Sequence, residues 1–257
     1  MGAIIDRLRA GQLVRVMHFT GLSSPKLVEV AGILGNFHGL WIDQEHSAVS
    51  HSQLELMLMA CRAVGLDAFA RVAPTDYATI MRPMEAGCSG VMIAQLRTLE
   101  EVREVVSWTK YPPRGVRGMF GGTFEAGYGA VPMREHAERA NRDRWVAIQI
   151  ETAEAVDDIG RIAALDGVDH LFVGPADLSV NLGVPGEFLH AKCIAALEKI
   201  SQAAQQSRKS WGILSQDPEH VRVCRKLGCQ LFSIFGDVSC FRAGLKALEE
   251  KFHDIMD

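Results

Sequence analysis

The segment from Trp145 to Ser179 decides the fold that we predict for this chain. It contains two short apolar runs, Trp145-Val-Ala-Ile-Gln-Ile150 and His170-Leu-Phe-Val173, each followed at once by polar residues. Continuous apolar runs of this length are typical of parallel strands buried on both faces. In a closed barrel of such strands, the carboxyl ends open into one shared mouth. Glu151 and Asp177 would then lie together, and paired carboxylates favour a divalent cation that prefers oxygen ligands.

The same unit, an apolar strand followed by a turn and a helix, recurs along the whole chain. We predict eight strands, at residues 13–19, 39–42, 68–72, 90–94, 145–150, 170–173, 211–214 and 231–235. Segments with helical periodicity follow them, at residues 24–34, 52–64, 77–86, 98–109, 153–165, 190–206, 217–227 and 238–251. Strands that alternate with helices pair in parallel through right-handed crossovers. Eight such units in 257 residues predict an α/β fold of the (β/α)8 TIM-barrel type.

An open doubly wound sheet is the main alternative to the barrel. It is disfavoured because no G-x-G-x-x-G segment follows an early strand and because eight similar units exceed what such a sheet usually needs. No linker rich in glycine, proline or serine divides the chain. We therefore expect residues 1–257 to form a single domain.

The overall composition excludes several classes of partner. A net charge of −4, with basic residues scattered among acidic ones, gives no basis for a nucleic-acid partner. No apolar run is long enough to span a bilayer, and the first residues do not resemble a secretory signal, so we expect a cytoplasmic protein without a membrane partner. The six cysteines contain no C-x-x-C pair, which favours buried free thiols and disfavours structural zinc.

One connection, at residues 111–144, is much longer than the others. Its first part is rich in glycine and carries Arg114 and Arg117, and a short charged helix follows. Long irregular connections are often lids or subunit contacts, so the two arginines could meet anionic substrates. A solvated or interface loop is an equally good interpretation.

Four of the predicted strand ends carry polar groups suited to catalysis. The second strand is followed by Asp43 and His46, the third ends at Arg71, the fifth carries Gln149 and Glu151, and the sixth is followed by Asp177. Each of them alone has an ordinary explanation as a surface histidine, a structural ion pair or a helix cap. In a barrel, however, all four ends open on the same face. Their coincidence there predicts one site.

These residues lie in motifs that resemble the HpcH/HpaI family of metal-dependent class II pyruvate aldolases. The motifs are Ile42-Asp-Gln-Glu-His46, Ala70-Arg71, Lys110-Tyr-Pro-Pro-Arg-Gly-Val-Arg-Gly118, Gln149-Ile-Glu151 and Gly174-Pro-Ala-Asp-Leu-Ser179. The resemblance covers nearly the whole chain in the expected order. Gln44, Glu85 and the Ala94-Gln95 pair depart from the family pattern, which leaves the substrate open more than the reaction class.

The resemblance implies a role for each matching residue. Glu151 and Asp177 would be the protein ligands of a divalent metal, and Arg71 would donate to the keto oxygen of a 2-keto acid. Gln149 would support the site, the backbone N–H groups of Ala176 and Asp177 would hold the substrate carboxylate, and His46 would transfer protons. Members of the family form oligomers, often hexamers in which the last helix packs on a neighbouring subunit, so the resemblance also implies a homohexamer.

Physical chemistry favours the same reaction. Retro-aldol cleavage of a 4-hydroxy-2-keto acid to pyruvate and an aldehyde leaves an enolate, which a metal and an arginine stabilise. A Schiff-base aldolase would need a lysine at a strand end, and none of the polar strand ends has one. Proton removal near neutral pH suits His46, which Asp43 or Glu85 could orient. Oxygen ligands favour Mg²⁺ or Mn²⁺, and Co²⁺ also fits.

Two other functions are compatible with the sequence. The same enolate would serve an oxaloacetate decarboxylase or a citramalyl-type thioester lyase, although no basic groove for coenzyme A is evident. A non-catalytic barrel that serves assembly, through the long loop and the apolar helix at residues 241–252, is the least favoured alternative.

Overall fold

The computed structural model describes residues 4–256 and shows a closed barrel of eight parallel strands, in the order β1 to β8. β1 pairs with both β2 and β8, which closes the barrel and confirms the predicted fold. The strands are β1 (Val14–Phe19), β2 (Gly39–Asp43), β3 (Asp67–Val72), β4 (Gly90–Ile93), β5 (Trp145–Ile150), β6 (His170–Val173), β7 (Ser210–Leu214) and β8 (Leu231–Gly236). Each lies within two residues of its predicted bounds at either end.

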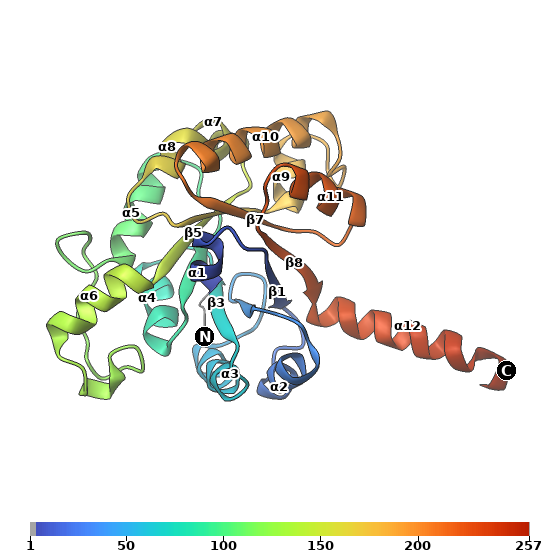
Figure 1. Ribbon diagram of the computed structural model, residues 1–257, viewed down its shortest axis with the longest axis horizontal. Coiled ribbons are helices and arrows are strands. Elements are labelled where there is room, and N and C mark those ends of the chain that lie inside the picture. The colour runs from blue at the N-terminus through green and yellow to red at the C-terminus, as the bar shows by residue number, and fades with distance from the viewer. Residues whose placement is uncertain (1–3, 257) are drawn as a thin grey trace.

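Helices surround the strands, as Figure 1 shows. Those that follow the predicted segments are α2 (Pro25–Leu34), α3 (His51–Ala63), α4 (Tyr77–Ala86), α5 (Leu99–Thr109), α6 (Met133–Asp143), α7 (Ala153–Asp157), α8 (Ile159–Ala164), α10 (Ala191–Gln206), α11 (Pro218–Lys226) and α12 (Asp237–Met256). The single helix predicted at residues 153–165 is two helices, because Asp158 has ψ near 7° and interrupts the helical backbone. Helices α1 (Ile4–Arg9) and α9 (Pro175–Asn181) and a 3-10 turn, η1 (Gly127–Gly129), were not predicted.

The interior of the barrel is filled by apolar side chains. Trp41, Phe69, Trp145 and Phe172 belong to one buried cluster inside the ring of strands, and α1 contributes Ile4, Ile5 and Leu8 to the same cluster. A second, larger cluster packs the outer faces of the strands against the helices. The barrel is therefore a packed core, and polar side chains at the carboxyl ends of the strands form the floor of its mouth.

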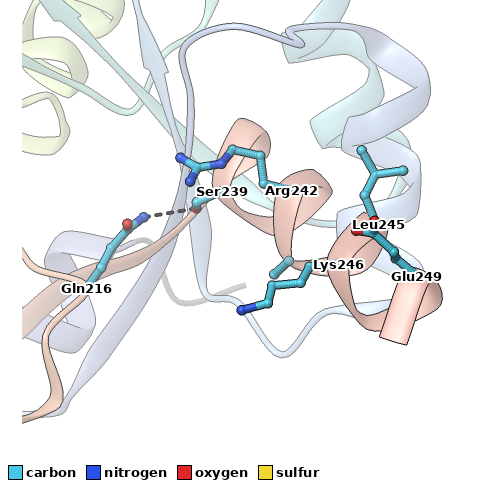
Figure 2. Close-up of a pocket in the computed structure, with 7 residues that line it drawn as sticks. Gln216, Ser239, Arg242, Leu245, Lys246 and Glu249 are labelled. Carbon is cyan, nitrogen blue, oxygen red and sulfur yellow. Dashed lines mark hydrogen bonds between the residues drawn. The ribbon is translucent and has the colours of Figure 1, made fainter. Parts of the chain in front are cut away.

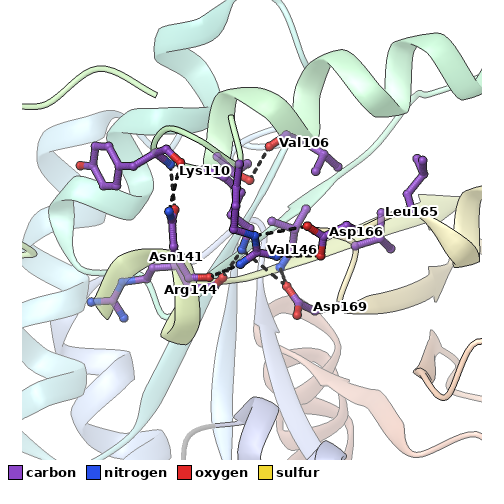
Figure 3. A network of polar contacts seen from close by, with 12 residues as sticks. Val106, Lys110, Asn141, Arg144, Val146, Leu165, Asp166 and Asp169 are labelled. Atoms are coloured by element: carbon purple, nitrogen blue, oxygen red, sulfur yellow. Dashed lines mark hydrogen bonds and ion pairs between the residues drawn. The ribbon is translucent and has the colours of Figure 1, made fainter. Parts of the chain in front are cut away.

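The long connection at residues 111–144 is fastened to the barrel by polar contacts (Figure 3). Lys110 Nζ donates to the carbonyl of Arg144 at 2.7 Å, and Asn141 Oδ1 accepts from the backbone N–H of Tyr111 at 2.7 Å. Arg114 binds the carboxylate of Asp166 through two nitrogens. These contacts make the segment an ordered part of the fold.

The structure contradicts the expected role of Arg117 in substrate binding. Its guanidinium is completely buried and forms an ion pair with Glu125, which also binds Arg144. No sequence pattern predicts this ion pair, because Glu125 lies eight residues further along an irregular loop.

Candidate active site

Asp43 and Arg71 lie side by side at the mouth of the barrel, on paired positions of β2 and β3. Arg71 Nε donates to Asp43 Oδ1 at 2.9 Å, and Nη2 donates to Oδ2 at 2.6 Å. The guanidinium also lies 4.7 Å from the ring centroid of Trp41. Both charged groups are buried. A two-point contact of this kind fixes the plane of the guanidinium and leaves its other N–H groups available to a ligand.

Glu45 is a second carboxylate beside Arg71, and we did not predict it as a site residue. Its Oε2 lies 3.1 Å from Arg71 Nε, although this buried oxygen accepts no hydrogen bond. The two observations agree because the single N–H of Nε already points at Asp43. The sequence signal for Glu45 was its place in the Ile42-Asp-Gln-Glu-His46 motif, two residues after Asp43.

Glu151, at the end of β5, has no exposed surface. Its Oε1 accepts from the backbone N–H of Gln95 at 2.7 Å, and its Oε2 accepts from the side-chain amide of Gln149. Burial raises the pKa of this carboxyl, the hydrogen bonds from Gln149 and Gln95 oppose the rise, and the charges of Glu45 and Asp177 add to it. A buried carboxylate among like charges is stabilised by a bound cation.

Asp177 lies in the first turn of α9 and lines the same cavity as Arg71 and Gln149. Gly174, just before this helix, leaves room for Glu151. A Cβ at position 174 would lie only 2.6 Å from Glu151 Oε2. The predicted metal ligands, Glu151 and Asp177, therefore follow adjacent strands. Any side chain at position 174 would contact Glu151.

The residues around this cavity fit a hard divalent cation. Glu151 and Asp177 offer carboxylate oxygens, and the buried Oε1 of Gln149 has no hydrogen-bond partner. Between residues 4 and 256, no group of three or more His, Cys, Asp or Glu side chains is arranged to hold a metal. A site here would thus have two carboxylate ligands, with further oxygens supplied by substrate and water.

His46 lies on the rim of the cavity, with 61% of its side chain exposed. Its Nε2 is 3.7 Å from Glu45 Oε1, so Glu45 is its acidic neighbour. The groups expected to orient His46 lie elsewhere. Asp43 turns into the barrel toward Arg71, and Glu85 on α4 lines a different cavity, where Arg117 and Glu125 are its charged neighbours. Within this chain, neither Asp43 nor Glu85 is therefore placed to orient His46.

The cavity has a volume of about 330 Å³. Its polar lining includes His46, Arg71, Gln149, Asp177 and Ser215. The apolar lining is Trp41, Phe172, Pro175, Phe188 and Leu214. A fixed arginine, paired carboxylates and an apolar wall in one cavity suit a small anionic substrate with an uncharged part.

The model of the HpcH/HpaI aldolase/citrate lyase family matches residues 15–242. The chain belongs to this family. An HpcH/HpaI relative in Sagittula stellata, a hydroxypyruvate/pyruvate aldolase, is 32% identical over 240 residues and covers 93% of each chain. The 5-keto-4-deoxy-D-glucarate aldolase of Salmonella paratyphi C is 31% identical, over 95% of this chain and 94% of its own.

Solved structures of the HpcH/HpaI family have the same architecture. The aldolase from Desulfitobacterium hafniense superposes with a TM-score of 0.89 at 27% identity, over 97% of this chain and 98% of its own. Like the two aldolases above, the chain is a carbon–carbon lyase of the aldolase class, and its reaction is a retro-aldol cleavage.

Proposed function

We propose that this enzyme reversibly cleaves a 4-hydroxy-2-keto acid to pyruvate, or a close analogue, and an aldehyde. The observation that carries the proposal is the fully buried Glu151, which lies near Asp177 and beside a cavity where Arg71 is held in a fixed orientation. The names of the two relatives, a hydroxypyruvate/pyruvate aldolase and a keto-deoxy-glucarate aldolase, support the same class of substrate.

Arg71 supplies the positive charge that the reaction needs at the keto oxygen. Cleavage of the carbon–carbon bond leaves negative charge on that oxygen, and preorganised donors stabilise it. Asp43 holds the guanidinium through Nε and Nη2, so the remaining N–H groups are free to donate to the substrate. Burial strengthens these contacts because little water competes with them.

Gln149, Ala176 and Asp177 would hold the keto acid. The backbone N–H groups of Ala176 and Asp177 belong to the first turn of α9, where amides have no partner within the helix. They would donate to the substrate carboxylate. Gln149 already donates to Glu151 and keeps that carboxylate in place.

His46 would move the proton of the substrate hydroxyl. Its position on the rim leaves the imidazole accessible, and histidine titrates near neutral pH. Glu45 Oε1 lies 3.7 Å from His46 Nε2 and is the acidic group beside it. Asp43 does not orient His46 in this assignment, because its carboxylate accepts two hydrogen bonds from Arg71.

Glu151 and Asp177 would hold the divalent metal, with Gln149 beside them. A metal bound there acts as a Lewis acid toward the keto acid. Carboxylate ligands suit Mg²⁺ or Mn²⁺, and Co²⁺ is compatible as well.

The test is a comparison of Glu151→Gln and Asp177→Asn with the wild type. We expect both variants to lose Mn²⁺ binding by calorimetry and pyruvate release from a panel of 4-hydroxy-2-keto acids, with an unchanged circular dichroism spectrum. Glu154→Gln, an exposed position in the first turn of α7, is the matched control. Full activity of the wild type in excess chelator would overturn the proposal.

Oxaloacetate decarboxylation is a second candidate, because it would form the same pyruvate enolate at Arg71. A coenzyme A thioester is disfavoured, since Arg71 is the only permanent cation among the described residues that line the cavity. None of the helices between residues 4 and 256 combines the length and the apolar character that a membrane span requires.

We further propose that α12 mediates self-association, as expected from the family resemblance. This helix extends away from the barrel (Figure 1), and its exposed apolar residues recur at intervals of four and three: Phe241, Leu245, Leu248, Phe252 and Ile255. Such a spacing is typical of a helix that packs on another helix. Gln216, on the rim of the active-site cavity, donates to Ser239 in the first turn of α12 at 2.9 Å (Figure 2). A partner on α12 would therefore lie close to the mouth.

A further inference from the structure

We infer that Phe188 and its apolar neighbours in the cavity bind the aldehyde half of the substrate and select uncharged aldehydes with an apolar chain. The inference rests on the proposed aldolase function and specifies its acceptor. It concerns the part of the cavity that the proposed contacts to the keto acid leave unused. Phe188, Leu214 and Phe172 make up this apolar wall.

Phe188 is held in place although it belongs to the connection between α9 and α10. Its ring stacks on the imidazole of His220, with ring centroids 5.6 Å apart and an angle of 21° between the planes. His220 is buried, and its Nδ1 lies 3.0 Å from the hydroxyl of Ser215. Ser215 follows β7 directly and itself lines the cavity. The end of a barrel strand thus fixes the wall.

The charges around the cavity disfavour an acidic aldehyde. Among the described residues that line it, Arg71 is the only permanent cation, and it already faces Asp43 and Glu45. Asp177 adds a negative charge at the same cavity. A second substrate carboxylate would lose water without gaining an unused cation, whereas an alkyl chain would gain contact with Phe188.

Two residues of the wall, Phe188 and Leu214, come from segments that hold none of the groups assigned to the keto acid, whereas Phe172 pairs in register with Gln149. The groups assigned to the keto acid are Arg71, Gln149 and the first turn of α9. Changes to Phe188 should therefore affect reactions that use an aldehyde. They should affect oxaloacetate decarboxylation less, because that reaction needs the enolate and no aldehyde.

The experiment measures pyruvate addition to hexanal, glycolaldehyde and succinic semialdehyde by the purified enzyme with Mn²⁺. For the wild type we expect kcat/KM to be at least about tenfold higher with hexanal than with succinic semialdehyde. Phe188→Ala should lower kcat/KM for hexanal by about tenfold, and lower kcat/KM for glycolaldehyde and for oxaloacetate decarboxylation several-fold less than that. Phe188→Leu should restore most of the loss. Phe120→Ala, an exposed phenylalanine away from this cavity, is the control.

Two results would overturn the inference: equal or faster reaction of the wild type with succinic semialdehyde, or an unchanged preference for hexanal in a folded Phe188→Ala. The comparison of hexanal with succinic semialdehyde in the wild type tests the inference even if Phe188→Ala does not fold. If the wild type decarboxylates oxaloacetate and the Phe188 variants have the same aldehyde preference as the wild type, only the role of the apolar wall is contradicted. A wild type without either reaction contradicts the proposed function itself.

Discussion

Asp43 and Arg71, which pair in register on β2 and β3, are joined by two hydrogen bonds at the mouth of the barrel. The pair fixes the guanidinium where the keto oxygen is expected. Asp43 therefore acts on the reaction through Arg71.

We expect Asp43→Asn to lower kcat by about 10- to 100-fold, because the guanidinium loses its orientation. Stopped-flow or coupled assays of pyruvate release measure this. Asp166→Asn is the matched control, since Asp166 binds Arg114 by the same two-point contact away from the cavity. Equal activities of the two variants would contradict the assigned role.

Gly174→Ala should also lower activity, by at least about tenfold, because its Cβ would lie 2.6 Å from Glu151 Oε2 and displace a proposed metal ligand. Mn²⁺ affinity should fall in parallel. Gly160→Ala in α8 meets no atom within 4 Å and should leave activity unchanged, while it raises the free energy of unfolding by about 0.5 kcal/mol. Wild-type Mn²⁺ affinity in Gly174→Ala would argue against this site.

His170 should make stability depend on pH. Burial inside the barrel lowers the pKa of this histidine to about 3, below its ordinary value of 6.5. Between these values the unfolded chain binds the extra proton, so the free energy of unfolding falls as pH drops from 6.5 toward 3, by up to about 1.4 kcal/mol per pH unit. Above pH 6.5 the effect is absent. Urea unfolding of wild type and His170→Asn at pH 7.5, 6 and 5 isolates this contribution, and parallel curves would exclude it.

Charged substitutions on α12 should disrupt assembly. Leu245→Glu with Leu248→Glu places two carboxylates in the apolar stripe, and we expect a smaller particle in sedimentation velocity than the wild type forms. Glu249→Gln, on the same helix, is the control and should keep the wild-type mass. A monomeric wild type would remove this role from α12.

The eight strands were predictable because each is a short, mostly apolar and mostly buried run, and the order of alternating elements left few possible topologies. Glu151, Asp177, Arg71 and His46 were found because strand ends open on one face, and the structure places all four around one mouth. The seven-residue α9 was missed, since it is too short to show a helical period.

The unpredicted parts depend on contacts between distant residues. Glu85 was predicted as a partner of His46 and Glu45 was not, yet Glu45 reaches Arg71 and Glu85 faces Arg117, because side-chain direction at a loop or helix follows from packing. The stacking of Phe188 on His220 joins segments that share no motif. Their proximity follows from contact between the loop after α9 and α11, the helix that carries His220.

Gln95 holds Glu151 with its main chain, and its φ of 60° places the N–H there. The side chain of residue 95 takes no part in this contact. The position should therefore accept many residue types during evolution, while proline, which lacks the N–H and cannot adopt this φ, is excluded and β-branched residues are disfavoured. At this position natural selection should therefore act on the backbone conformation more than on the identity of the side chain.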